Sequence, residues 1–466
     1  MSLFRKGEYY WKKKNILGTE NISKLLMKFA VPSILAMIIS AFYNIVDQIF
    51  IGNSVGILGN AATNVAFPLT TICIAIALTC GIGAAANFNI SLGEENYERA
   101  KHYIRNGITL AITLSVLLTI ITRIFMKPLL ISFGATEELM EYAIEYISIT
   151  SIGFIFLIFV NVGSTLIRAD GSPKYSMYAM VVGAITNIIL DPIFIFKFDM
   201  GMSGAALATV ISQVISSLMV IYYFKNRFKS VNLKNQFFEL NTDYAINIIK
   251  LGSASGFNQV AILVVQVVMN NFYRYYGSLS EYGANIPLAA VGIVMKVNMI
   301  FFSIHIGLSQ GLQPIASFNY GAKKYNRVIA VYLDAIKKAL IVSVISFLIF
   351  QIFPRQILQL FGGGSELYYD FGVKFFRIFL FFVFIIGIQP VTMGFLTSIG
   401  LAKKGILIAL LRQVILLIPF AYIFSHFFGL EGLLYSAPAA DFITAIITII
   451  VGYRVIKSLK KNIKNS

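Results

Sequence analysis

Two aspartates inside apolar segments are the residues of this sequence best suited to chemistry. Asp47 lies in the run AFYNIVDQIFIG and Asp191 in NIILDPIF. Each stands about five residues before the expected end of its segment, which is roughly 8 Å along a helix. A charge within a membrane costs free energy unless it has a partner or a function. Their shared depth therefore predicts a common site.

Two polar side chains are expected near these carboxylates. Asn187 precedes Asp191 by one helical turn on the same face, and Thr209 reaches about the same depth from the next segment. Carboxylate, hydroxyl and amide oxygens suit a hard cation, and a pair of buried carboxylates suits a proton carrier. Pro192 also frees a backbone carbonyl nearby. The alternative is that each aspartate only satisfies a neighbouring helix, although no basic residue lies at that depth in the first half.

The second half of the chain carries a different set of intramembrane charges. Lys296, Arg412 and Asp441 each lie well inside an apolar segment. Two interpretations stay open for them. They form a paired polar lock that holds this half together, or they contact the substrate and take part in gating.

The elements that position these residues are membrane-spanning helices. Hydrophobic residues make up 58% of the 466 positions, charged residues only 13%, and the mean hydropathy is +0.78. Apolar runs of 18 or more residues recur, and each is long enough to cross a bilayer. Twelve spans are expected near 25–52, 60–90, 103–126, 138–167, 173–197, 203–225, 243–273, 286–319, 328–352, 367–398, 404–426 and 431–455.

The distribution of Lys and Arg predicts the orientation of these spans. In and beside the loops on the side of the N-terminus there are 29 Lys and Arg residues, against five on the other side. Because cytoplasmic loops carry the excess of positive charge, both termini are expected in the cytoplasm, and the basic N-terminal segment is not a cleaved signal peptide. The net charge of +17 is divided among short clusters between spans, so nucleic-acid binding is not expected.

An internal repeat divides the chain in two. The stretch GIGAAANFNISLGEENYER, from Gly81, is similar to GLQPIASFNYGAKKYNR, from Gly311, and later matches keep an offset of 228 to 230 residues. Six spans per half predict a parallel repeat, which favours a carrier that works by alternating access. The expected organisation is an N-lobe (1–226), a cytoplasmic linker (227–242), a C-lobe (243–458) and a basic tail (459–466).

Enzymatic motifs do not fit this architecture. The run GLSQG, from Gly307 to Gly311, has the G-x-S-x-G spacing but lies inside a membrane helix rather than at a strand-to-helix turn. The three histidines lack metal-ligand spacing and there is no P-loop. We expect neither an enzyme nor a cofactor, and nothing is similar to the selectivity filter of a channel.

Several motifs together resemble a known family. AFYNIVDQIFIG (Ala41 to Gly52), RADGSPKYSM (Arg168 to Met177), NIILDPIF (Asn187 to Phe194) and GLSQGLQPIASFNYGAKK (Gly307 to Lys324) are similar to the multidrug and toxic compound extrusion (MATE) family, and within it to the MepA-like bacterial branch. The resemblance covers nearly the whole chain. It implies a multi-pass, two-lobe protein of the bacterial cytoplasmic membrane that exports small organic cations in exchange for H⁺ or Na⁺. The expected partners are these cations and membrane lipids, and we expect the protein to be monomeric.

The resemblance also assigns site residues. It implies a coupling site at Asp47 and Asp191, with Asn187, Thr209 and, deeper in its span, Asn161 as polar helpers. Some members carry acidic residues on the seventh and tenth spans, where this chain offers Gln259 and Gln389. We therefore place the coupling in the N-lobe. The alternative function is a lipid or oligosaccharide flippase of the same superfamily, favoured if the central cavity is strongly cationic.

Overall fold

The computed structural model describes residues 16–233, 236–361 and 364–465, and all regular structure in these ranges is helical. The basic segment 1–15 and the last residue of the predicted tail lie outside them. The helices of the first half are α2 (Ile16–Thr19), α3 (Ile22–Ser54), α4 (Ile57–Gly93), α5 (Tyr97–Ile124), α6 (Met126–Ser132), α7 (Glu137–Ala169), α8 (Pro173–Pro192), the π-helical η1 (Ile193–Lys197) and α9 (Gly201–Asn226). Those of the second half are α10 (Thr242–Ser278), α11 (Asn285–Gly321), α12 (Tyr325–Ile352), α13 (Pro354–Gln359), α14 (Glu366–Lys374), η2 (Phe375–Phe379), α15 (Val383–Ile386), α16 (Ile388–Ser398), α17 (Ala402–Leu410), η3 (Leu411–Leu417) and α18 (Ile418–Asn465).

The described helices account for the predicted spans. Ten are long and apolar enough to cross a membrane, and an eleventh span is the pair 366–379 and 383–398, bent by 43°. One of the ten, Ala402–Lys464, has 63 residues, about three times the length that a crossing needs. It contains a non-helical residue, Gly429, with φ 59° and ψ −138°. Division at Gly429 gives two crossings and brings the described chain to the twelve that the sequence predicts.

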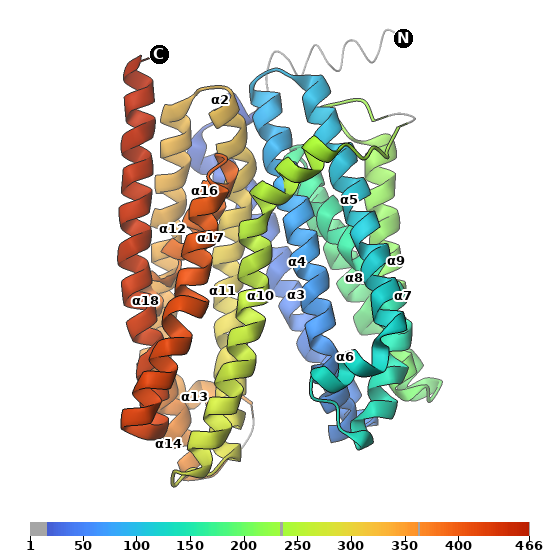
Figure 1. Ribbon diagram of the computed structural model, residues 1–466, viewed down its shortest axis with the longest axis vertical. Coiled ribbons are helices and arrows are strands. Elements are labelled where there is room, and N and C mark those ends of the chain that lie inside the picture. The colour runs from blue at the N-terminus through green and yellow to red at the C-terminus, as the bar shows by residue number, and fades with distance from the viewer. Residues whose placement is uncertain (1–15, 234–235, 362–363, 466) are drawn as a thin grey trace.

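Two short helices, α6 and α13, were not expected from the sequence. Each follows a long helix, α5 or α12, at the equivalent place in its half of the repeat. Both lie at the end of the molecule opposite to α2 and the end of α18 (Figure 1). They are too short to span a bilayer, and they lie in the stretches that follow the expected spans 103–126 and 328–352, where the sequence predicts loops.

The helices form two bundles, α3 to α9 and α10 to α18 (Figure 1). We call the end of the molecule that carries α2 and the end of α18 the terminal end. The first bundle has its own apolar core, and the second has two. Leu17 and Leu25, at the start of the chain, belong to a core of the second half, where they pack with Leu312 and Val328. The exact lobe boundaries and the cytoplasmic placement of the terminal end stay predictions.

The bundles meet where α4 packs on α10 and α3 on α11. One close approach at the terminal end is reciprocal. A Cβ atom on Gly93 would lie 2.1 Å from the carbonyl oxygen of Phe318, and one on Gly321 would lie 2.1 Å from that of Ile90. Gly93 and Gly321, like Ile90 and Phe318, differ by the repeat offset of 228. The interface therefore has the self-complementary form of a two-fold contact.

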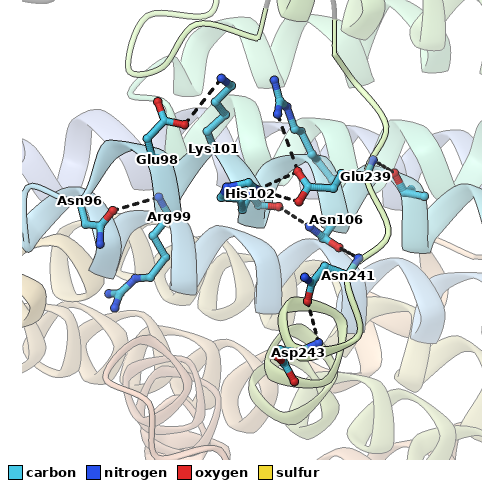
Figure 2. A network of polar contacts seen from close by, with 11 residues as sticks. Asn96, Glu98, Arg99, Lys101, His102, Asn106, Glu239, Asn241 and Asp243 are labelled. Carbon is cyan, nitrogen blue, oxygen red and sulfur yellow. Dashed lines mark hydrogen bonds and ion pairs between the residues drawn. The ribbon is translucent and has the colours of Figure 1, made fainter.

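The connection between the bundles is held against α5 (Figure 2). His102 Nδ1 lies 2.7 Å from Glu239 Oε1, and the backbone N–H of Glu239 donates to Thr109 Oγ1 at 2.9 Å. Two residues later the N–H of Asn241 donates to Asn106 Oδ1 at 2.6 Å. These contacts fasten the described part of the linker to the first bundle.

Candidate functional site: two buried carboxyls in the first bundle

The end of α8 brings Asp191 to its place. Proline at 192 has no N–H to donate, so the regular hydrogen-bond ladder cannot continue, and the chain passes into the wider π-helical turn η1. Asp191 sits on the last turn of α8 before this change and is fully buried. Helix α3, which carries Asp47, and α9, which carries Thr209, both pack against α8. Three helices therefore converge on one site.

The predicted first-half residues meet there. The carboxyl groups of Asp47 and Asp191 lie within hydrogen-bonding reach of each other. Asn187 Nδ2 donates to Asp191 Oδ1 at 3.2 Å and lies 3.5 Å from Thr209 Oγ1. Asp47 is 9% exposed, Asn187 1% and Asp191 0%. The site is therefore removed from solvent on nearly all sides.

Several acceptor oxygens in the site have no partner among the described residues. They are Asp47 Oδ1, Asp191 Oδ2 and Asn187 Oδ1. No described Lys, Arg or His forms an ion pair with either aspartate. Buried acceptors without donors are costly, and two adjacent carboxylates cannot both stay charged without a cation between them. The arrangement therefore favours a shared proton or a small bound cation.

Two tyrosines complete the site and were not expected from the sequence. Tyr43 lies one turn before Asp47 on α3, and its phenol is close enough to interact electrostatically with both aspartates. Tyr146 on α7 is close to the same two carboxyls and to Thr209. The one-turn spacing from Asp47 was a signal for Tyr43. No such spacing points to Tyr146, which only the packing of α7 on α8 and α9 brings to the site.

Among the described residues, the side chain of Asn161 does not contact the carboxyl site through a hydrogen bond. Its Nδ2 donates to the backbone oxygen of Leu157, one turn back on α7, at 2.8 Å. No described hydrogen bond joins its side chain to either aspartate.

The charged residues of the second half separate into a pair and a single cation. Arg412 Nε lies 2.6 Å from Asp441 Oδ1, between η3 and α18, and the two side chains are 17% and 6% exposed. Lys296 on α11 is exposed and forms no ion pair with a described residue. The structure therefore joins two of the three residues and leaves Lys296 outside the contact.

The two glutamines in place of acidic residues are half-buried. Gln389 Nε2 donates to the backbone oxygen of Ile408 at 3.3 Å, which ties α16 to α17. Gln259 on α10 has no described side-chain hydrogen bond. Among the described residues, no three His, Cys, Asp or Glu side chains lie close enough together to hold a metal ion.

The family of the chain follows from a comparison with known sequences. The family model MatE matches residues 32–193 and 255–423, which together make up well over half of the chain. The chain belongs to the MATE family. Both matched segments carry site residues discussed above, Asp47 and Asp191 in the first and Lys296 and Arg412 in the second. A MATE protein is a multi-pass membrane transporter and not an enzyme.

Individual relatives agree with this membership. The multidrug export protein MepA of Staphylococcus aureus (strain MSSA476) is 25% identical over 445 residues, which cover 96% of this chain and 95% of MepA. A crystal structure of MATE in complex with MaL6 is 26% identical, with a TM-score of 0.88 over 95% of this chain and 98% of that one. A multidrug resistance MATE transporter in an outward-facing conformation is 25% identical, with a TM-score of 0.85 over 95% and 99%.

Proposed function

We propose that this MATE protein is a secondary antiporter that exports small organic cations and takes in H⁺ or Na⁺ through Asp47 and Asp191. The observation that carries the proposal is a pair of buried, adjacent carboxyls with no basic partner among the described residues. Such a pair has a strong preference for one added positive charge. The names of the relatives, which are multidrug exporters, support organic cations as the class of cargo.

The coupling follows from competition for this negative charge. When the site faces outside, a proton or Na⁺ enters between Asp47 and Asp191 and neutralises it. The attraction for an organic cation then falls, which favours its release and the return of the carrier. Because coupling free energy is reciprocal, a bound organic cation must equally weaken binding of the coupling ion.

The supporting side chains suit either ion. For a proton, Asn187 and the two tyrosines supply polar contacts around a carboxyl pair that shares it. For Na⁺, the three oxygens without partners and the hydroxyl of Thr209 are hard ligands of the kind that this ion takes. Both ions therefore enter the same experiment as separate arms.

The experiment measures efflux of a fluorescent organic cation from proteoliposomes under a pH gradient or a Na⁺ gradient alone. We expect wild type to export under one of them. Asp191→Asn keeps the size of the side chain but removes the second charge, so gradient-driven export should fall at least tenfold. Unchanged export by Asp191→Asn would overturn the proposed site.

A matched control is available in the same region. Asp199→Asn also removes one carboxylate, but Asp199 is exposed and its positive φ of 51° is one that asparagine adopts readily. This variant should export like wild type. Loss of export in both variants would indicate a general effect of charge rather than a coupling role.

The flippase alternative has less support. A flippase for an anionic headgroup needs several unpaired cations along its path. Arg412 is paired with Asp441, so only Lys296 of the two second-half cations discussed above has no ion pair with a described residue. The same proteoliposomes, loaded with a fluorescent phospholipid, test it directly. Lipid transfer without export of the organic cation would favour the flippase.

A further inference from the structure

A cavity lies outside the carboxyl site, at the terminal end of the first bundle. It is formed where the turn between α7 and α8 meets the end of α9, and its volume is about 330 Å³. Its lining consists of Ser172, Tyr175, Tyr223, Arg227 and Lys229. The proposed antiport uses none of these residues.

The cavity is positively charged. Arg227 is exposed, and its guanidinium lies 5.8 Å from the ring centre of Tyr175 and 5.7 Å from that of Tyr222. Lys229 is also exposed, and its Nζ donates to Ser172 Oγ at 3.1 Å. Neither cation forms an ion pair with a described Asp or Glu. The two cations at the opening of the cavity are therefore available to bind an anion.

The nearest acidic residue, Asp170, is fully buried behind the cavity, and its oxygens are occupied. They accept hydrogen bonds from the hydroxyl of Tyr223 at 2.7 Å, from the N–H of Lys229 at 3.0 Å and from Ser230 through both its N–H and its hydroxyl, at 2.9 and 2.6 Å. Asp170 thus fixes the backbone that carries Lys229 without pairing with the side chains of the two cations.

The position of the cavity indicates which anion it meets. It opens beside the last turns of α9, whose side chains Leu218, Ile221 and Tyr222 are 59%, 48% and 50% exposed. An apolar face that ends in Tyr and Arg is typical of the boundary between acyl chains and headgroups. Basic pockets between spans at the cytoplasmic face suit anionic lipid headgroups.

We propose that this cavity binds the phosphate of an anionic phospholipid. The phosphate oxygens accept hydrogen bonds from Arg227 and Lys229, the ring of Tyr175 lines the headgroup, and the acyl chains lie along the exposed face of α9. A bound lipid then holds Lys229, and with it the start of the linker, at the membrane surface.

The experiment is native mass spectrometry of the purified full-length protein with phosphatidylglycerol or phosphatidylcholine. Wild type should bind phosphatidylglycerol more tightly. The double variant Arg227→Gln/Lys229→Gln should bind it roughly 30-fold more weakly, because it loses two cations that attract an anionic headgroup near the membrane surface. The control Lys460→Gln/Lys461→Gln removes the same charge from an exposed part of α18 at the same end and should bind like wild type. Equal loss in the two double variants, or in neither, would overturn the site.

A second variant keeps both cations. Ser172→Asp places a carboxylate against Lys229, and aspartate is a good residue at the start of a helix. It should fold normally, as thermal unfolding in phosphatidylcholine checks, and should lose the preference for phosphatidylglycerol. A parallel series with inorganic phosphate distinguishes the source of the anion. Wild-type stabilisation by inorganic phosphate, with no preference between the two lipids, would replace the lipid with a soluble phosphate ligand.

Discussion

At the scale of single residues, the chain contains two kinds of buried carboxylate. Asp47 and Asp191 keep oxygens without partners, whereas Asp441 and Asp170 have theirs occupied, by Arg412 in one case and by four donors in the other. The first kind is free to respond to a cation that arrives, because no fixed partner competes for the charge. The second kind holds helices and linker in place.

The Arg412 and Asp441 pair can be tested for a structural role with a double-mutant cycle. Removal of one partner leaves a buried charge, so Arg412→Met or Asp441→Leu alone should destabilise the protein by about 3–5 kcal/mol. The double variant should recover most of this loss, because neither charge remains. Thermal unfolding measures the cycle. If the double variant recovers its stability but does not export, the pair instead contacts the substrate or takes part in gating.

Asp170 gives a prediction about pH. Burial raises the pKa of this carboxyl from 3.8 to about 6, although its hydrogen bonds oppose the rise. A raised folded-state pKa means that the folded state binds the proton more tightly, so this stabilisation is complete below pH 4 and is lost as the pH rises through 6. Between pH 7 and pH 4 the contribution of Asp170 should grow by up to about 3 kcal/mol. The free energy of unfolding, plotted against pH over this range, should have a different slope for wild type and for Asp170→Asn. Parallel curves would contradict the prediction.

At the scale of elements, glycine decides how closely the bundles approach. Gly93 and Gly321 each face a backbone oxygen of the other bundle at a distance that no side chain tolerates. Neither has a positive φ, so the local backbone does not require glycine there. The requirement comes entirely from the neighbouring helix.

Gly321→Ala should therefore separate the bundles at the terminal end. Alanine favours a helix by about 0.5–1 kcal/mol over glycine, but its Cβ would overlap Ile90, at a cost of about 1–3 kcal/mol for overpacking. Spin labels at the exposed positions Glu98 and Asn326 report the separation. The control Gly292→Ala lies on the same helix with nothing within 4 Å of its Cβ and should leave the distance distribution unchanged. A wild-type distribution in Gly321→Ala would show that the contact does not limit the interface.

At the scale of the whole molecule, the carboxyl site and the cavity of Arg227 and Lys229 lie toward opposite ends of the first bundle. Asp47 lies near the end of α3 that is remote from the terminal end, and Arg227 directly follows α9 at the terminal end. If the terminal end is cytoplasmic, the coupling ion enters from outside and the proposed lipid belongs to the inner leaflet. The orientation therefore links both proposals.

Cysteine labelling in intact cells measures the orientation. Lys127→Cys, in α6, should react with a membrane-impermeant maleimide, whereas Lys461→Cys, near the end of α18, should react only after the cells are opened. The native Cys73 and Cys80 are buried and contribute little background. The reverse pattern would place the termini outside.

The sequence by itself determined the twelve spans, the repeat and the depth of Asp47 and Asp191, because all three follow from apolar length and residue spacing along one chain. Only the tertiary structure decided which side chains meet. It added Tyr146 to the carboxyls through the packing of α7, joined Arg412 to Asp441 while Lys296 stayed apart, and brought the turn after α7 to the end of α9. Contacts between helices distant in sequence depend on how each helix is rotated about its axis, and the apolar pattern of a membrane helix, similar on all sides, does not specify that rotation.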